Sequence, residues 1–92
     1  MTALTDQQIA AKLESLPAWR LEAGELVRQF QFEDFLGAMR FVNAVAKLAE
    51  SAGHHPDIDI RYNRVRLALV THDAGGMTAK DFELAAQADK AV

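Results

Sequence analysis

Residues 57–70 read DIDIRYNRVRLALV, and their pattern points to the fold more plainly than any other part of the chain. Apolar side chains alternate with other residues up to Tyr62 and again from Val65, which is the two-residue period of a strand with one buried face. Asn63-Arg64 separates the two runs, and asparagine tolerates the positive φ of a tight turn. The stretch therefore predicts an antiparallel β-hairpin. Its apolar row consists of Ile58, Ile60, Tyr62, Val65, Leu67 and Leu69.

A second hairpin is predicted upstream, between residues 18 and 32. Its turn lies at Ala23-Gly24, where glycine can supply the positive φ that a tight turn needs. Beyond the turn, the even-numbered residues from Leu26 onward form the predicted buried face of the strand. Arg28 is the exception among them because it is charged.

Three other segments have the 3.6-residue period of amphipathic helices. Thr5 and Gln8 form a capping box at the start of the first segment. Thr78 and Asp81 form another at the start of the last. Gly53 is a natural residue to end the middle helix. The predicted helices cover residues 5–15, 33–52 and 78–90.

These elements follow one another as helix, hairpin, helix, hairpin, helix within a single domain, residues 1–92. The order predicts an α+β two-layer sandwich, in which a four-stranded antiparallel sheet carries three helices on one face. Nothing obvious blunts the sheet edges, so an edge strand could pair with a second copy of the chain. The stripe expected to face the sheet from the middle helix is Phe35, Met39, Val42, Val45 or Ala46, and Ala49.

Composition narrows the classes of function. Ten Lys and Arg residues against thirteen Asp and Glu give a formal charge of −3, which argues against a nucleic-acid-binding protein. The chain has no cysteine, so disulfides, thiolate metal sites and thiol nucleophiles are excluded. No run approaches the ~20 apolar residues that span a bilayer, and residues 1–8 do not read as a secretion signal. We therefore expect a cytoplasmic protein with no membrane or nucleic-acid partner.

All three histidines lie between residues 54 and 72, and the register of the predicted hairpin brings two of them together. A two-residue loop at Asn63-Arg64 pairs Tyr62 with Val65. The same ladder pairs Ile60 with Leu67, Ile58 with Leu69, Asp57 with Val70, and His55 with His72. Cross-strand partners have Cβ atoms about 4.5–5.5 Å apart. The pattern therefore predicts a cluster of imidazoles at one end of this hairpin.

His54 follows the C-terminal end of the middle helix, where the helix dipole favours an imidazolium. Glu50 lies four residues before His54, and its carboxylate could bind an imidazole and fix its tautomer. Three imidazoles with a carboxylate titrate near neutral pH and suit proton transfer. Asp81 already has a structural role in a capping box, and a functional role is compatible with its position.

Three interpretations of the histidines compete. Three histidines can bind zinc, but two consecutive strand residues point to opposite faces and the spacing matches none of the usual zinc signatures. Strand-end histidines can also be merely polar and hydrogen-bonded. Clustered titratable groups favour a functional site, so acid–base catalysis without a metal is the interpretation we favour.

The chain closely resembles the pterin-4a-carbinolamine dehydratase family along nearly its whole length. The specific feature is a glutamate four residues before His-His-Pro, with a further histidine seventeen residues beyond and an aspartate after it. The matching residues are Glu50, His54-His55-Pro56-Asp57, Tyr62-Asn63-Arg64-Val65, Thr71-His72-Asp73, Gly76-Met77-Thr78 and Asp81, with Trp19 and Phe30-Gln31-Phe32-Glu33-Asp34-Phe35 upstream.

The resemblance implies a lyase that dehydrates 4a-hydroxytetrahydropterin to quinonoid dihydropterin and water, and so recycles the pterin used by aromatic amino acid hydroxylases. It implies an antiparallel sheet with its helices on one side, and association as homodimers or homotetramers. It also implies that the enzyme needs no metal and no cofactor, since the pterin is the substrate. The alternative is a dehydratase-like scaffold that serves as a protein-interaction or dimerisation module.

The resemblance also assigns residues. The family's three site histidines fall on His54, His55 and His72, and its acidic positions fall on Glu50 and Asp81. We expect His54 to act as the acid, His72 as the base and His55 to bind and orient the pterin. Exchanging the roles of His54 and His72 would fit the sequence equally well.

Overall fold

The computed structural model of the protein describes residues 2–92. The elements along the chain are α1 (Asp6–Leu13), β1 (Arg20–Glu22), β2 (Glu25–Gln31), α2 (Phe35–Ala52), β3 (Asp57–Arg61), β4 (Arg64–Leu69), the short 3₁₀ helix η1 (His72–Ala74) and α3 (Ala79–Lys90). The four strands form one antiparallel sheet in the order β1-β2-β4-β3. The two hairpins therefore meet through β2 and β4, which lie at the centre of the sheet.

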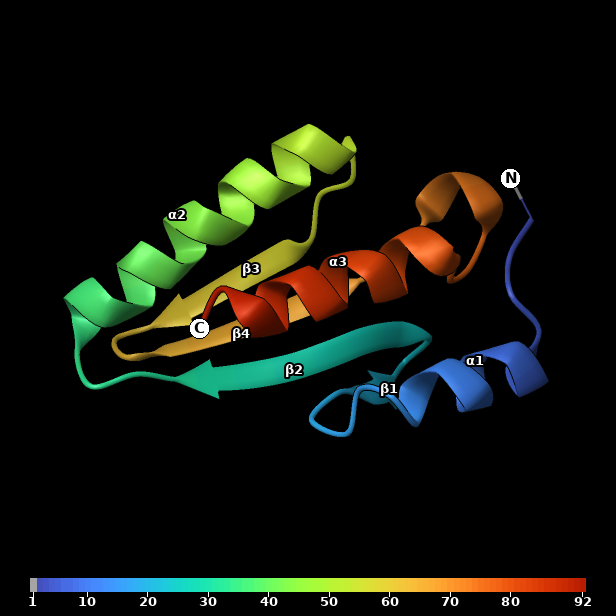
Figure 1. The fold of residues 1–92 in the computed structure, drawn as a ribbon, viewed down its shortest axis with the longest axis horizontal. Coiled ribbons are helices and arrows are strands. Elements are labelled where there is room, and N and C mark those ends of the chain that lie inside the picture. The colour runs from blue at the N-terminus through green and yellow to red at the C-terminus, as the bar shows by residue number, and fades with distance from the viewer. Residues whose placement is uncertain (1) are drawn as a thin grey trace.

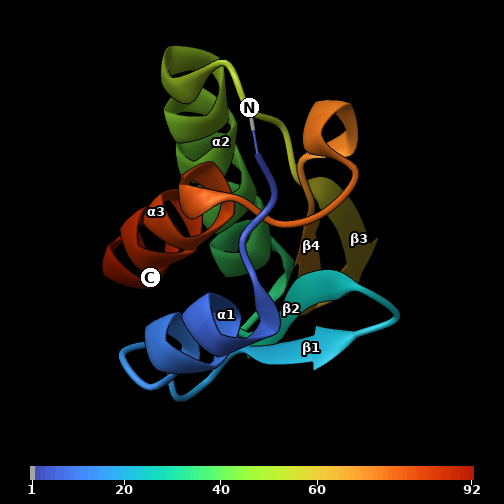
Figure 2. The same cartoon turned by 90° about the vertical axis from the view of Figure 1, so that its right-hand side faces the viewer.

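The three helices cover one face of this sheet, as the α+β sandwich prediction requires (Figures 1 and 2). The core lies between the layers. Its fully buried leucines, at about 1.5–3 kcal/mol for each such side chain, are a main source of stability. The core includes Leu26, Phe30, Val65, Leu67 and Leu69 from the sheet, with Ala38, Phe41, Val45, Ala49, Leu84, Ala85 and Ala88 from the helices.

No helix within residues 2–92 has both the length and the apolar character to cross a membrane.

The predicted helix starts are confirmed by their caps. The Thr5 hydroxyl accepts a hydrogen bond from the Gln8 N–H at 3.2 Å, and the Gln8 side chain accepts one from the Thr5 N–H at 2.8 Å. Asp34 caps α2 by accepting from the Gly37 N–H at 2.8 Å. Each contact satisfies an N–H that has no partner within the helix.

The predicted buried stripe of α2 was only partly right. The helix is buried through Ala38, Phe41, Val45 and Ala49, while Phe35 is 47 % exposed. The reason lies just before the helix, where Phe32 takes the aromatic position against Phe41 with ring centroids 5.1 Å apart. Two overlapping apolar stripes satisfy the helical period on α2, and packing selects the one that contains Phe41.

The predicted turn of the second hairpin was wrong by one residue. The loop is Tyr62-Asn63, with Tyr62 at φ 53°, and Arg61 pairs with Arg64. Asn63 fixes this position because its side chain donates to the Phe32 carbonyl at 2.9 Å and its own carbonyl accepts from the Phe32 N–H at 2.8 Å.

The shifted turn changes every cross-strand partner by two residues, so Ile60 pairs with Val65 and Ile58 with Leu67. Because a shift of two preserves the alternation of side chains, both strands keep the predicted apolar face. Asp57 pairs with Ala68 instead of Val70, and it is the first residue of β3. His55 is therefore not the cross-strand partner of His72.

Arg28, the charged exception in the buried row of β2, has a specific partner. Its guanidinium lies 2.5 Å from Asp89 of α3 and stacks over the Phe30 ring at 4.1 Å. The same Asp89 oxygen accepts a hydrogen bond from the Trp19 indole at 2.9 Å. This contact ties the first hairpin to the last helix, and it lets a cation lie in an otherwise apolar row.

The opposite face of the sheet carries paired charges. The Glu22 carboxylate lies 2.8 Å from Arg20 and 3.2 Å from Arg66. The hydrogen bond from Arg20, with a smaller contribution from Arg66, holds the pKa of the Glu22 carboxyl below its usual value. The residues of this face are polar apart from Val27 and Ala68, which pair across β2 and β4 and are buried, and the rest agrees with the alternation read from both hairpins.

Candidate active site

The three histidines line one pocket at the end of the sheet, as predicted, although the hairpin register was wrong. The pocket has a volume of about 250 Å³. His54 and His55 reach it from the connection between α2 and β3, and His72 from the start of η1. The complete lining is Gly53, His54, His55, Val70, Thr71, His72 and Asp73.

The end of α2 sets the position of His54. Gly53 adopts the left-handed conformation with φ 62°, which glycine tolerates better than any residue with a side chain. This turn lets the His54 N–H donate back to the Ala49 carbonyl at 3.1 Å. The chain then leaves the helix through Pro56, so His54 is fixed between a capped helix and a rigid residue.

His54 contacts the one fully buried carboxylate in the described chain. Its Nε2 lies 2.5 Å from Oδ1 of Asp81, and the two side chains are 10 % and 0 % exposed. An ionised carboxylate only accepts hydrogen bonds, so His54 must donate from Nε2. With Nε2 as the donor, that contact fixes the tautomer and leaves Nδ1 without a hydrogen bond inside residues 2–92.

Two threonines hold the Asp81 carboxylate in place. Its Oδ2 accepts from the Thr71 hydroxyl at 2.8 Å and from the Thr78 N–H at 2.9 Å. The two threonine hydroxyls lie 2.9 Å apart, and both side chains are buried. Every buried side-chain polar atom within residues 2–92 has a partner, which is what an unstrained buried network requires.

This network joins the two roles that the sequence left open for Asp81. One oxygen binds the backbone N–H in the predicted capping box, and the other binds His54. Sequence reasoning missed Thr71 as part of the site. The available signals were its place next to His72 and its part in the Thr71-His72-Asp73 stretch of the family resemblance, since a threonine beside a loop has no periodicity that would reveal its partner.

Glu50 binds His55 through Oε2 and Nε2, so it orients His55 and not His54. The side chains of His55 and Glu50 are 63 % and 77 % exposed. Water screens such a pair strongly, so it contributes at most about 1 kcal/mol. The site therefore contains two imidazole–carboxylate pairs, one buried and one in solvent.

His72 differs from the other two histidines in having a free imidazole. Its side chain is exposed, and within residues 2–92 no side-chain hydrogen bond holds it. The backbone around it is fixed by the bridge from Thr71 to Gly76 and by Gly75 at φ 70°. The ring can therefore reorient while its attachment point stays fixed.

The histidine and carboxylate side chains of the site are not arranged around a common position for a metal ion. No three His, Asp or Glu side chains in the described chain are arranged to hold a metal ion. The Nε2 atoms of His54 and His55 each meet a different carboxylate. What the arrangement supplies is several proton donors and acceptors around one small pocket.

Comparison with known families and proteins gives consistent matches. The family model described as "Pterin 4 alpha carbinolamine dehydratase" matches residues 2–91. A protein of Acidobacterium capsulatum, named provisionally as a pterin-4-alpha-carbinolamine dehydratase, is 66 % identical, and the match covers 94 % of each chain. A protein of Chloroflexus aurantiacus with the same provisional name is 60 % identical over 98 % of this chain and 97 % of its own.

Solved structures agree with this fold. The Brucella melitensis protein described as a transcriptional coactivator/pterin dehydratase has a TM-score of 0.94 and 32 % identity, with 98 % of each chain covered. A pterin dehydratase-like protein described as a RuBisCO assembly factor in the alpha-carboxysome has a TM-score of 0.65 and 24 % identity. The second match covers 79 % of this chain and 84 % of that one, and it bears on the fold alone.

Proposed function

Because the chain belongs to the pterin 4 alpha carbinolamine dehydratase family, we propose that it converts 4a-hydroxytetrahydropterin to quinonoid dihydropterin and water. The observation that carries the proposal is the pocket lined by His54, His55 and His72. One of these imidazoles is held by a buried carboxylate and one is free in solvent. Acid and base groups of this kind are what the elimination of water needs.

The reaction requires two proton transfers. The bond from ring carbon to hydroxyl breaks with its electron pair, and the hydroxyl takes a proton to leave as water. A ring nitrogen loses its proton, and the electrons of that N–H bond form the carbon–nitrogen double bond. One imidazolium and one neutral imidazole balance the step, and they exchange protonation states during it.

We assign the acid to His54. Its Nε2–H is held by Asp81, so Nδ1 is the position from which it delivers a proton. The buried Asp81 carboxylate provides the compensating negative charge while His54 is an imidazolium. Thr71 and Thr78 keep that carboxylate oriented, so it need not reorganise during the reaction.

His72 is then the base. It faces the same pocket from η1, and its exposed ring can pass the accepted proton to water. His55 binds and orients the pterin at the pocket entrance, with Glu50 holding its ring. Positioned acid–base groups contribute about 10²–10⁴-fold to such steps, which is adequate for a carbinolamine that already loses water unaided.

The test is the dehydration rate of freshly generated 4a-hydroxytetrahydrobiopterin with and without the protein, in the presence of a metal chelator. The proposal predicts acceleration that the chelator leaves unchanged, since only imidazoles move protons. Acceleration that chelation abolishes would favour the zinc interpretation. A folded protein without any acceleration would favour the protein-interaction module instead.

A further inference from the structure

A small hollow lies on the helix-free face of the sheet, near the loop between β3 and β4, and we call it the arginine hollow. It has a volume of about 100 Å³. Its residues alternate along the strands with core residues such as Val65 and Leu67, so they lie on the face away from the helices. None of them lines the histidine pocket. The complete lining is Gln29, Asp59, Arg61, Arg64 and Arg66.

Strand pairing holds two of these arginines directly opposite each other. Arg61 pairs with Arg64 in the last pair before the loop, and Arg64 pairs with Gln31 of β2 on its other side. Directly opposed residues have Cβ atoms about 4.5–5.5 Å apart, and like charges in such a pair are destabilising. None of these three residues is a carboxylate that would offset the repulsion. An anion between the two guanidinium groups would remove it.

The nearest carboxylates leave an excess of positive charge around the hollow. Asp59 lies 3.5 Å from Arg61, and Glu22 lies 3.2 Å from Arg66 while it also binds a further arginine of β1. Four arginines therefore share two carboxylates, which leaves two positive charges uncompensated. The other acidic residues of this face are the first residues of β2 and β3, at the opposite end of their strands.

Arg61 and Arg64 keep their hydrogen-bonding capacity for a ligand. Neither side chain donates a hydrogen bond within residues 2–92. The atom of Arg61 closest to Asp59 is Nε, and a guanidinium carries five N–H donors in a rigid fork. The Nη groups of both arginines are therefore suited to accept a ligand with several oxygen atoms.

The size of the hollow limits the class of ligand. Its volume of about 100 Å³ corresponds to about three water molecules at ~30 Å³ each. Pockets that enclose drug-sized ligands begin at about 300 Å³, so a ring system does not fit inside. A small tetrahedral oxyanion does fit, and guanidinium groups bind phosphate oxygens in pairs. A dianion would also match the two uncompensated positive charges.

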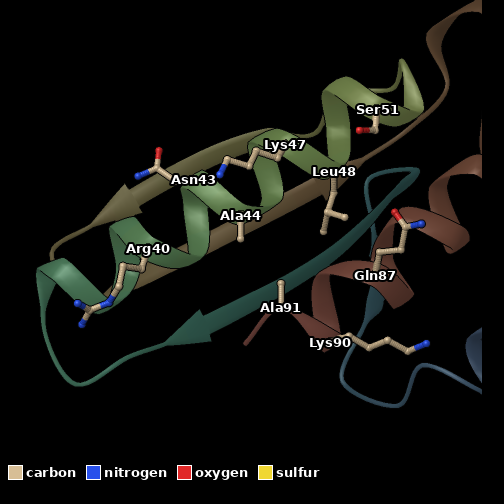
Figure 3. Close-up of a pocket in the computed structure, with 9 residues that line it drawn as sticks. All are labelled: Arg40, Asn43, Ala44, Lys47, Leu48, Ser51, Gln87, Lys90 and Ala91. Carbon is tan, nitrogen blue, oxygen red and sulfur yellow. The ribbon is translucent and has the colours of Figure 1, made fainter.

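The exposed cations between α2 and α3 are arranged differently. The hollow there has a volume of about 610 Å³, and its lining includes Arg40, Lys47 and Lys90. Figure 3 shows Arg40 and Lys90 extending toward opposite sides of it, with apolar side chains between them. Those cations do not surround a small volume, whereas the arginines of the sheet do. The arginine hollow is therefore the better anion site.

We propose that the arginine hollow binds a phosphate dianion between Arg61 and Arg64, either as inorganic phosphate or as the terminal group of a small phosphate ester. Arg66 and Gln29 supply further N–H donors. The site is separate from dehydration, because Asp57, at the histidine end of β3, is four residues from Arg61, or about 13 Å along the strand. A second copy paired with the edge of β3 would leave the site open, since side chains stand perpendicular to the sheet.

The experiment is a titration of isotope-labelled protein with sodium phosphate, followed by two-dimensional amide NMR spectra. Sodium chloride keeps the ionic strength constant, because exposed charges are screened by salt. A second titration uses glycerol phosphate. The wild type is compared with Arg61→Gln/Arg64→Gln and with a control, Lys12→Gln/Lys90→Gln. The control removes the same charge at exposed residues outside the hollow.

We expect saturable shifts of the amides of residues 61–66 in the wild type, with a Kd on the order of 1 mM. Arg61→Gln/Arg64→Gln should bind phosphate at least about tenfold more weakly, and the control should stay within about twofold. Phosphate should also raise the Tm of the wild type and of the control, because it binds the folded state. Glycerol phosphate that binds about tenfold more tightly than phosphate would identify an ester as the ligand, and otherwise the ligand is free phosphate.

Three results would overturn the proposal. One is a set of shifts that never saturates, and another is an affinity that Arg61→Gln/Arg64→Gln leaves unchanged. The third is an equal loss of affinity in the control, which would reveal a non-specific effect of charge. If the double variant does not fold, Arg64→Gln alone takes its place, and an unchanged affinity in that variant would have the same meaning.

Discussion

At the scale of single residues, Asp81 shows how one side chain can serve the fold and the site together. It caps α3 with one oxygen and binds His54 with the other, and it is fully buried. Glu50 is its exposed counterpart, since it binds His55 with most of its surface in water. Asp81 should therefore contribute more than Glu50 to the free energy of unfolding, although both carboxylates contact a histidine of the site.

Replacing each carboxylate by its amide tests this difference. Asp81→Asn replaces the buried oxygen that accepts from His54 Nε2–H by an NH₂ donor, so the present contact is lost, and we expect a loss of about 1–3 kcal/mol in unfolding free energy. The dehydration rate should also fall, by up to about 10²-fold, as the His54 tautomer is no longer fixed. Glu50→Gln should cost less than about 1 kcal/mol. Urea unfolding and kinetics on both variants check this, and equal stability losses would contradict the assigned burial.

At the scale of elements, the sequence was sufficient for the order of helices and hairpins, because capping boxes and alternation are local signals. The loop position in the second hairpin was not predictable, since it depends on a contact between Asn63 and Phe32 across 31 residues. The predicted buried face of α2 was partly wrong for the same reason, because the packing of Phe32 on Phe41 decides which face of the helix is buried. The prediction of a histidine cluster survived both errors, because the alternation was correct and all three histidines still lie at the same end of the hairpin.

The contact of Asp89 with Trp19 and Arg28 gives a prediction at this scale. Removing the carboxylate leaves a half-buried cation and an indole N–H without their acceptor. We expect Asp89→Ala to lower the unfolding free energy by about 1–3 kcal/mol. Glu83→Ala, at an exposed position on the same helix, should change it by less than about 0.5 kcal/mol. Thermal unfolding of the two variants compares them, and a similar effect of both would show that the contact contributes nothing.

At the scale of the whole molecule, the two edges of the sheet are unequal. β1 has three residues and β3 has five, and both strands are exposed along their whole length, so they differ in the length of free edge that each offers. Ile58 and Ile60 of β3 are each 37 % exposed. An unpaired strand with exposed apolar side chains is a template for pairing with another chain, so β3 is the edge through which a homodimer would form.

We propose on this basis that the chain forms a homodimer through β3. We expect the wild type to be a dimer in light scattering and Ile60→Lys to be a monomer, because a charge on the paired edge would have to be buried. Leu21→Lys, on the β1 edge, should leave the dimer intact. A dimer that survives Ile60→Lys and dissociates on Leu21→Lys would show that the dimer contact lies on the β1 edge, and it would contradict the prediction.

The central claim is that imidazoles of this pocket carry the dehydration, and His54→Ala tests it most directly. The dehydration of freshly generated 4a-hydroxytetrahydrobiopterin is measured in chelator with the wild type and the variant side by side. Circular dichroism establishes that both are folded. We predict that the variant loses about 10²-fold or more of the enzymatic acceleration, since its proton donor is gone. A folded variant that dehydrates the pterin as fast as the wild type would contradict the account.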